Sequence, residues 1–378
     1  MRLLIINGPN LNLLGTREPD IYGSETLGDL EAAWRRHGTK MGIGIDAFQS
    51  NHEGGIIDEI HASGPRHNGI VINAGALTHY SYAIHDALVA IDVPVVEVHI
   101  SNVHEREEWR RSSVIAPATE RVIYGRGTEG YLDAINLLVA RNEYPPTSLH
   151  YGPDPDQVID LRIPARPKAL VVLIHGGFWR SQWARDTLDP LAAALAEVGY
   201  ATANIEYRRG PGSVAVSRDD VERAIEAISS HLTDTVDIDL PTVVVGHSAG
   251  GSLAIRYGES HPDVTTVALS PAVDLEALSA ERPDDDPIAA YIGADRATQP
   301  GLWEEAALSG RNGSNLSIVH GLEDASIPSA HSEAFHASHP ATTLVILEGV
   351  DHSDLIRPHH DAFDAITAAI DGGSIGTH

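Results

Sequence analysis

The stretch RLLIINGPNLNLLGTREPDIYG (residues 2–23) joins a short apolar run to a long loop. The run RLLII is typical of a buried β-strand, because its residues are mostly branched and apolar. The loop after it contains too many Gly and Pro residues to continue as a strand or to form a helix. It still carries side chains suited to binding or proton transfer, namely Asn10, Asn12, Arg17 and Tyr22. We therefore interpret the loop as part of a functional site.

Three more strand-like runs follow the first one, at residues 43–48, 69–74 and 93–100. Amphipathic stretches typical of helices separate them, and a further one at residues 130–142 closes the pattern. Alternation at this spacing predicts an α/β domain with a parallel, doubly wound sheet. Ligands bind such sheets at the carboxyl ends of the strands, so we expect the polar residues that follow each strand to meet in one crevice.

Two pairs of residues at these strand ends indicate acid–base chemistry. A Tyr side chain has an ordinary pKa near ~10, and a nearby guanidinium lowers it, so Arg17 close to Tyr22 predicts a phenolate base. Glu97 and His99 lie two residues apart in a predicted strand, which puts both side chains on one face of the sheet. Glu97 is then placed to fix the tautomer of the His99 ring for proton transfer.

Four segments of this half resemble the motifs of type II 3-dehydroquinate dehydratases. They are INGPNLNLLGTREPDIYG, FQSNHEG, INAGALTHYSYAIHDAL and VVEVHISNVHEREEWRRSS, in the order and spacing of that family within residues 1–144. The resemblance implies a flavodoxin-like fold and a homo-oligomer built from trimers, up to a dodecamer. It also implies conversion of 3-dehydroquinate to 3-dehydroshikimate without a metal or a cofactor.

The resemblance further implies roles in proton transfer for individual residues. Tyr22, as the tyrosinate, takes the proton next to the ketone, and Arg17 on the same loop lowers the pKa of Tyr22. Asn10 stabilises the enolate that forms. His99, held by Glu97, protonates the departing hydroxyl.

A second set of residues is implied to bind the substrate. The matching positions are Asn73 and the backbone amides of Ile100 and Ser101 for the carboxylate, and His79, Arg110 and Asp86 for the ring hydroxyls. Two positions depart from the family, because Ser112 stands where many members have His and His85 stands where Arg is common. Neither position transfers a proton, so we expect altered packing or affinity rather than loss of the reaction.

Residues 145–156 are rich in Pro, Gly and polar side chains, and we expect them to form a linker. Strand-like runs separated by helical stretches then start again, which predicts a second, independent α/β domain over residues 157–378. Residues 276–312 interrupt this alternation, and we interpret them as an insertion above the second sheet.

The second domain contains a predicted serine nucleophile. GHSAG (residues 246–250) lies between an apolar run and a helical stretch, which is the context of a nucleophile elbow. We predict that Ser248 attacks a carbonyl, that His352 takes and returns its proton, and that Asp324 orients His352. Asp351 is a rival orienting residue, but a direct neighbour in the chain rarely has the geometry, so we favour Asp324.

The HGG sequence at residues 175–177 predicts an oxyanion hole formed by the backbone amides of Gly177 and Ala249. Together, the stretches HGGFW, IEYRR and GHSAGG resemble the esterase and kynurenine-formamidase-like branch of the α/β-hydrolases over residues 157–370. The RPHH sequence at residues 357–360 does not predict a metal site, because two adjacent His residues on a helix do not face one ion.

Composition narrows the choice of partners. The chain has 378 residues and a net charge of −27, which repels nucleic acid and anionic membranes. No apolar run approaches the ~20 residues of a membrane span, and we recognise no signal peptide, so we expect a cytoplasmic protein with small-molecule substrates. The absence of Cys from the sequence excludes disulfides and thiolate catalysis.

Taken together, the sequence predicts a type II dehydroquinate dehydratase fused to a serine hydrolase that acts on a carboxylic ester or a formamide, with a quinate- or shikimate-type ester as one hypothesis. Two alternatives stay open. In one, the second domain is an inactive scaffolding or interaction module on a dehydratase. In the other, the first domain is only an assembly core for an unrelated hydrolase.

Overall fold

A computed structural model describes residues 1–16, 25–236, 240–310, 315–358 and 360–372. The chain divides into two compact units, Met1–Asn142 and Glu143–His378. Each unit contains its own sheet, and each is described by itself below.

Unit 1 contains one five-stranded sheet in which all neighbouring strands are parallel. The strands are β1 (Arg2–Asn7), β2 (Gly44–Gln49), β3 (Gly69–Asn73), β4 (Val95–His99) and β5 (Arg121–Tyr124). Their order across the sheet is β2-β1-β3-β4-β5. This is the flavodoxin-like order, so the predicted fold class of the first domain is confirmed.

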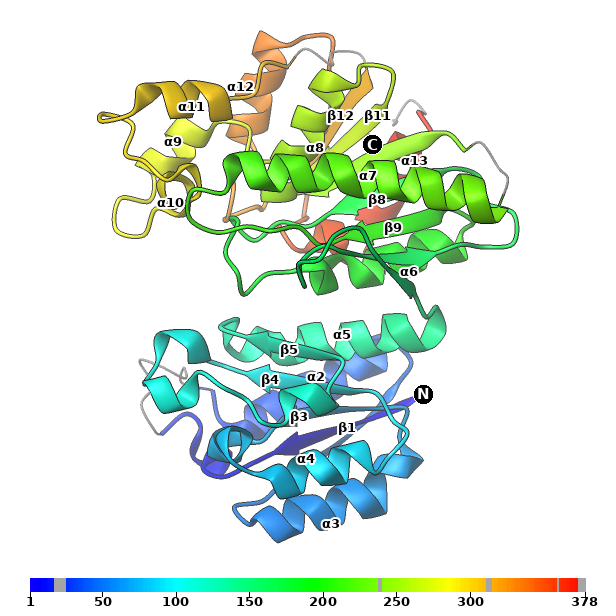
Figure 1. Ribbon diagram of the computed structural model, residues 1–378, viewed down its shortest axis with the longest axis vertical. Helices are drawn as coiled ribbons and strands as arrows, with labels where there is room; N and C mark the ends of the chain where they lie inside the picture. The colour runs from blue at the N-terminus through cyan, green and yellow to red at the C-terminus, as the bar shows by residue number, and fades with distance from the viewer. Residues whose placement is uncertain (17–24, 237–239, 311–314, 359, 373–378) are drawn as a thin grey trace. The chain divides into compact units, whose positions relative to one another are not determined.

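Helices cover both faces of this sheet (Figure 1). One face carries α2 (Leu27–Lys40) and α5 (Gly130–Glu143), and the other carries α3 (Glu53–Ser63) and α4 (Tyr82–Val89). β3 and β4 are buried along their whole length, because helices exclude water from both sides.

Unit 2 contains an eight-stranded sheet in the order β13-β12-β11-β10-β8-β9-β7-β6. Its strands are β6 (Thr147–His150), β7 (Val158–Arg162), β8 (Leu170–Ile174), β9 (Ala201–Ile205), β10 (Thr242–His247), β11 (Thr265–Leu269), β12 (Leu316–Gly321) and β13 (Thr343–Leu347). β8 to β13 pair in parallel, whereas β6 and β7 pair antiparallel. The expected linker at residues 145–156 therefore contains an edge strand, which Ser148 ties to Asp160 of β7 through a 2.7 Å hydrogen bond.

Four helices sandwich the central strands of this second sheet (Figure 1). α6 (Asp189–Glu197) and α13 (Ala362–Ile370) pack on one face, and α7 (Val214–Val236) and α8 (Ala249–Ser260) pack on the other. α12 (Ala330–Ser338) lies between β12 and β13 in the chain. The region interpreted as an insertion forms three short helices, α9 (Leu275–Ala280), α10 (Pro287–Ile292) and α11 (Pro300–Ala306).

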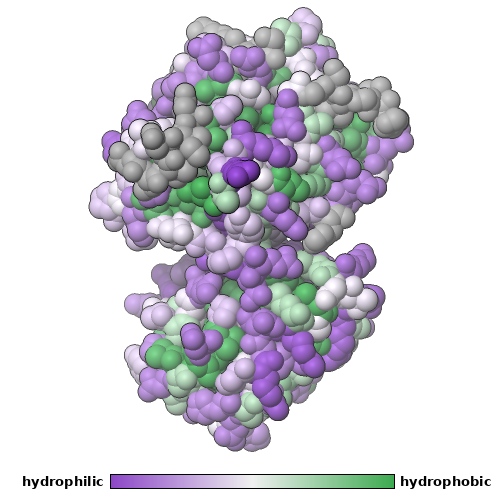
Figure 2. All heavy atoms as spheres, turned by 90° about the vertical axis from the view of Figure 1, so that its right-hand side faces the viewer, coloured by the Kyte–Doolittle hydropathy of each residue, from purple (hydrophilic) through white to green (hydrophobic). Residues whose placement is uncertain are grey.

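The surface is mixed in character. Figure 2 shows hydrophilic residues interspersed with smaller hydrophobic areas on the visible face. Among the described helices, none combines the length and the apolar character needed to cross a bilayer.

Candidate active sites

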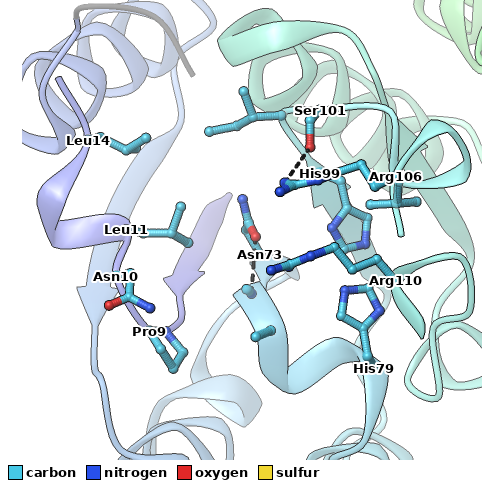
Figure 3. Close-up of a pocket in the computed structure, with 14 residues that line it drawn as sticks. Pro9, Asn10, Leu11, Leu14, Asn73, His79, His99, Ser101, Arg106 and Arg110 are labelled. Carbon is cyan, nitrogen blue, oxygen red and sulfur yellow. Dashed lines mark hydrogen bonds between the residues drawn. The ribbon is translucent and has the colours of Figure 1, made fainter. Parts of the chain in front are cut away.

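Unit 1 has a pocket at the carboxyl ends of β1, β3 and β4. Figure 3 shows the loop after β1 on one side of it and residues that follow β4 on the other, with Asn73 between them. The lining residues are Pro9, Asn10, Leu11, Leu14, Asn73, Gly75, Ala76, His79, His99, Ile100, Ser101, Val103, Arg106 and Arg110. The pocket thus gathers seven of the predicted residues from distant parts of the chain, as expected for a parallel sheet.

Residues that follow β2 hold the first of these loops in place. Asn10 has a φ of 67°, a left-handed conformation that Asn tolerates better than most residues. Its backbone N–H donates to Asn51 Oδ1 at 2.9 Å. Gln49 Nε2 donates to the same Asn51 oxygen at 3.0 Å and to the Gly8 carbonyl at 3.2 Å. The polar residues after β2 therefore support Asn10 and do not line the pocket themselves.

His99 is fixed by a buried carboxylate. Its Nε2 lies 2.8 Å from Glu97 Oε1, on the same face of β4. Ser113 Oγ donates to both Glu97 oxygens at 2.9 Å, and Thr78 Oγ1 also donates to this carboxylate. Because a carboxylate only accepts, it fixes the proton on Nε2 and leaves Nδ1 as the ring nitrogen available for proton transfer.

His79 and Arg110, the two side chains predicted to bind the ring hydroxyls besides Asp86, also line the pocket. His79 donates from Nδ1 to the Ser112 carbonyl at 2.8 Å, and partial burial lowers the pKa of His79. Arg110 lies 3.1 Å from Glu107 and stacks over Trp109 with 4.0 Å between the guanidinium carbon and the ring centroid. Since Ser112 contacts His79 through its backbone, replacing the family's His by Ser leaves this contact intact.

Some predicted residues are not in this pocket. Asp86 lies on α4 with its side chain 84% exposed and is not among the lining residues. Arg17 and Tyr22 lie outside the described residues. Conversely, Arg106 lines the pocket, with Nη1 3.5 Å from Ser101 Oγ, although sequence reasoning passed over it. The only sequence feature that could have pointed to Arg106 is its place four residues before Arg110, which lines the same pocket.

In unit 2, Ser248 occupies a strained turn between β10 and α8. Its φ of 58° and ψ of −122° are rare for a residue with a Cβ atom, as is typical of a nucleophile elbow. The HGG loop packs directly against it, because a methyl group on Gly176 would lie only 2.6 Å from Ser248 Cβ. Only glycine fits at position 176.

His352 is hydrogen-bonded to Asp324, which lies after β12. His352 Nδ1 is 2.6 Å from Asp324 Oδ2, and the backbone amides of Ser326 and Ile327 each donate to Asp324 Oδ1 at 2.8 Å. Burial alone would raise the pKa of Asp324, but hydrogen bonds from His320 and His352 outweigh it and hold that pKa below its usual range. Asp324 thus stays charged and leaves Nε2 of His352 for the nucleophile.

The rival residue Asp351 has a different contact. Its Oδ1 accepts from the backbone amides of Ser353 and Asp354 at 2.7 and 2.8 Å, so it stabilises the turn that carries His352. His360 Nε2 lies 3.6 Å from Asp354, and His359 lies outside the described residues.

The predicted oxyanion loop is supported from beneath by a charged network. Gly177 has a φ of 103°, and a methyl group there would meet the Trp183 side chain at 2.1 Å. Ala249 is the first residue of α8, where backbone N–H groups lack partners within the helix. Buried His175 donates from Nε2 to Glu206 Oε1 at 2.9 Å, and Arg209 Nη1 lies 2.6 Å from the same oxygen.

His247 links the turn at Ser248 to His352. Its Nε2 donates to the His352 carbonyl at 2.9 Å, and the two rings lie 4.5 Å apart. This contact ties the segment that carries His352 to the residue directly before Ser248 in the chain. Burial and the neighbouring His352 lower the pKa of His247 to about 3.

The depressed pKa of His247 predicts a pH dependence of stability. The unfolded chain binds a proton at this side chain near pH ~6.5, whereas the folded chain does so only near pH 3, so stability falls as the pH falls through this window. The slope is at most about 1.4 kcal/mol per pH unit. We expect His247→Asn to reduce this change of the unfolding free energy with pH. The free energy is measured by hydrogen exchange of β10 peptides in urea at pH 7, 6 and 5. Equal slopes in both proteins would contradict this assignment.

Each unit now has a recognisable class. Unit 1 is a flavodoxin-like domain with an acid–base pair at its strand ends, and unit 2 is an α/β-hydrolase-like domain with a serine elbow and a His–Asp pair.

Comparison with known proteins identifies the family of unit 1. Residues 1–139 match dehydroquinase class II. A catabolic 3-dehydroquinase of Verticillium alfalfae is 56% identical over 136 residues, which are 36% of this chain and 91% of that protein. A 3-dehydroquinate dehydratase of Halalkalibacterium halodurans is 56% identical over 137 residues, which are 36% of this chain and 94% of that protein. Through its first 139 residues, the chain belongs to the class II dehydroquinase family.

Unit 2 resembles esterases in its fold. Residues 159–338 match the family described as BD-FAE. A truncated carbohydrate esterase from gut microbiota is 20% identical with a TM-score of 0.50, covering 61% of this chain and 97% of that one. The predicted resemblance to an esterase-type α/β-hydrolase is thereby confirmed at the level of the fold, which leaves its substrate open.

Proposed function

We propose that unit 1 converts 3-dehydroquinate to 3-dehydroshikimate by a trans elimination of water through an enolate. The observation that carries this proposal is the Glu97–His99 pair at the wall of a pocket also lined by Asn10 and Asn73. In this proposal Tyr22 removes the proton beside the ketone, and Asn10 stabilises the negative oxygen of the enolate. His99 then gives its Nδ1 proton to the departing hydroxyl, and the Glu97 carboxylate stabilises the charged ring beforehand.

The substrate carboxylate is assigned to the far wall of the same pocket. Asn73 lies at the end of β3, and Ile100 and Ser101 follow β4 directly, so their polar groups converge from two adjacent strands. His79 and Arg110 lie on the same side of the cavity as His99 (Figure 3), and both suit the ring hydroxyls.

A direct test uses the ultraviolet absorbance of the conjugated product. Full-length protein is mixed with 3-dehydroquinate, and the enone absorbance is followed with time. A rise that is missing in the Tyr22→Phe variant supports the proposal. A wild-type protein that produces no rise contradicts it.

We further propose that unit 2 is an active serine hydrolase for a carboxylic ester or a formamide. The support is the strained elbow at Ser248 together with His352, which is oriented by a charged Asp324. Ser248 Oγ attacks the carbonyl carbon and loses its proton to His352, and the amides of Gly177 and Ala249 hold the oxyanion. His352 then protonates the leaving group, and water hydrolyses the acyl-enzyme by the same route. This support speaks against an inactive scaffolding module.

The covalent link to a dehydratase suggests which ester to try first. Release of quinate, shikimate or dehydroquinate from an ester would supply the kind of hydroxylated ring acid that unit 1 uses. Cleavage of simple acyl esters or formamides, with no cleavage of any such ring-acid ester, would contradict the ring-acid substrate. It would still support the hydrolase activity.

We also propose that the chain assembles through unit 1 into trimers and up to a dodecamer. Tyr82 and Val89 of α4, with Tyr80 just before it, are 69%, 62% and 60% exposed, which is unusual for large apolar side chains. Asp86 lies on the same helix, and in this proposal it contributes to the pocket of a neighbouring copy. We expect light scattering to give a multiple of three times the chain mass of 40.4 kDa. A particle of single-chain mass would contradict the proposal.

A further inference from the structure

Beneath the pocket of unit 1, a buried tyrosine connects two asparagines from neighbouring strands. Asn7 ends β1 and Asn73 ends β3, and the two residues are partners in the parallel register. Tyr131 reaches them from α5, on the face of the sheet that α2 and α5 cover. All three side chains are almost completely buried, with exposed fractions of 0%, 4% and 0%. None of the proton-transfer steps above uses Tyr131 or Asn7.

The hydrogen bonds among these residues run in one direction only. Burial raises the pKa of the Tyr131 phenol, so its hydroxyl keeps its proton. That hydroxyl donates to Asn7 Oδ1 at 2.7 Å. It therefore presents a lone pair to Asn73, whose Nδ2 donates to it at 2.9 Å.

The other half of the Asn73 amide is fixed as well. Its Oδ1 accepts from the Gly75 backbone N–H at 3.2 Å, a bond drawn in Figure 3. The Asn73 oxygen is bonded to Gly75, and one hydrogen of Nδ2 is bonded to Tyr131. The second hydrogen of Nδ2 therefore remains for a ligand. The amide cannot flip without breaking both bonds. Its orientation therefore favours an anion in the pocket.

We propose that Tyr131 is a positioning residue that orients the Asn73 carboxamide to donate to the substrate carboxylate. This inference rests on the proposed dehydratase function and adds to it a residue from outside the pocket. The ring itself is anchored separately, because it packs against Trp34 of α2 with 4.6 Å between centroids. Removing only the hydroxyl should thus leave the packing in place and free the amide to rotate.

The test is the affinity of the full-length protein for a ring carboxylate and for its neutral counterpart. Calorimetry is used with quinate and with quinate methyl ester, for the wild type and Tyr131→Phe. We expect about a tenfold loss of quinate affinity in the variant and no change for the ester, since a hydrogen bond to a charged group has been misaligned. Equal loss for both ligands, or no loss for quinate, overturns the proposal. The proposal is also overturned if the wild-type protein does not bind quinate more tightly than quinate methyl ester.

Further variants separate positioning from a general structural defect. In an Asn73→Ala background, Tyr131→Phe should have little further effect on quinate affinity, whereas independent effects would add. Asn7→Ala removes the acceptor that holds the Tyr131 hydroxyl, and we expect it to produce the same selective loss. Tyr124→Phe removes a hydroxyl from β5 and serves as the matched control without an effect.

The enone assay on the same wild-type sample keeps the two proposals apart. Carboxylate-selective binding that is lost in Tyr131→Phe, in a wild type without turnover, would refute the dehydratase function and uphold the role of Tyr131. Turnover with an unchanged KM in Tyr131→Phe would uphold the dehydratase function and refute the role of Tyr131.

Discussion

Replacing Ser248 by alanine is expected to reduce the hydrolysis of p-nitrophenyl acetate by a factor on the order of 10⁴ or more. The residual rate would come from the oxyanion hole and from binding alone, because His352 would have no hydroxyl to activate. The same variant should no longer react with a fluorophosphonate probe. Its dehydratase rate should be unchanged, since the two sites are built from separate units.

Ser252→Ala is the matched control for this experiment. Ser252 lies one turn further along α8, is also buried, and donates its hydroxyl to the Ala272 carbonyl at 2.6 Å. Loss of that bond costs stability of about 1 kcal/mol but leaves the elbow unchanged. If Ser248→Ala keeps more than about a tenth of the wild-type rate, Ser248 is not the nucleophile. The alternative that unit 2 is an inactive scaffolding module is then favoured.

The sequence was most informative where strands are buried on both faces. β3 and β4 stand out as short apolar runs, and their parallel order predicts that Asn73 and His99 meet, although they are 26 positions apart in the chain. β6 was missed, because an edge strand keeps polar and exposed residues and is recognised only through its partner, β7.

Residues that act through other residues were harder to predict. The bond between Tyr131 and Asn7 spans 124 positions, and an apolar helix pattern says that Tyr131 is buried without saying where its hydroxyl points. The same holds for Glu206, which contacts His175 of the HGG loop, and for His247, which contacts the His352 carbonyl. Asp86 lies within α4, away from the strand ends that form the pocket of its own chain, so its predicted contact with the substrate stays a prediction.

Replacing His99 by alanine is expected to lower kcat for 3-dehydroquinate by about a thousandfold, within the range that a positioned proton donor contributes. The hydroxide leaving group is poor, so loss of the acid should affect kcat far more than KM. The variant also leaves the buried Glu97 carboxylate without its contact to His99, with the hydroxyls of Ser113 and Thr78 as its remaining side-chain donors among the described residues, which costs stability as well.

Two comparisons separate catalysis from folding in this variant. His104→Ala removes a ring from the loop after the same strand, where it packs edge-on against Tyr124 outside the pocket, and should keep nearly full activity. Ester hydrolysis by His99→Ala reports that unit 2 is folded, and binding of quinate reports that the pocket of unit 1 is formed. A kcat within about tenfold of the wild type would mean that another group delivers the proton. His79 would then be the first candidate, because its ring stacks 6.4 Å from that of His99 in the same pocket.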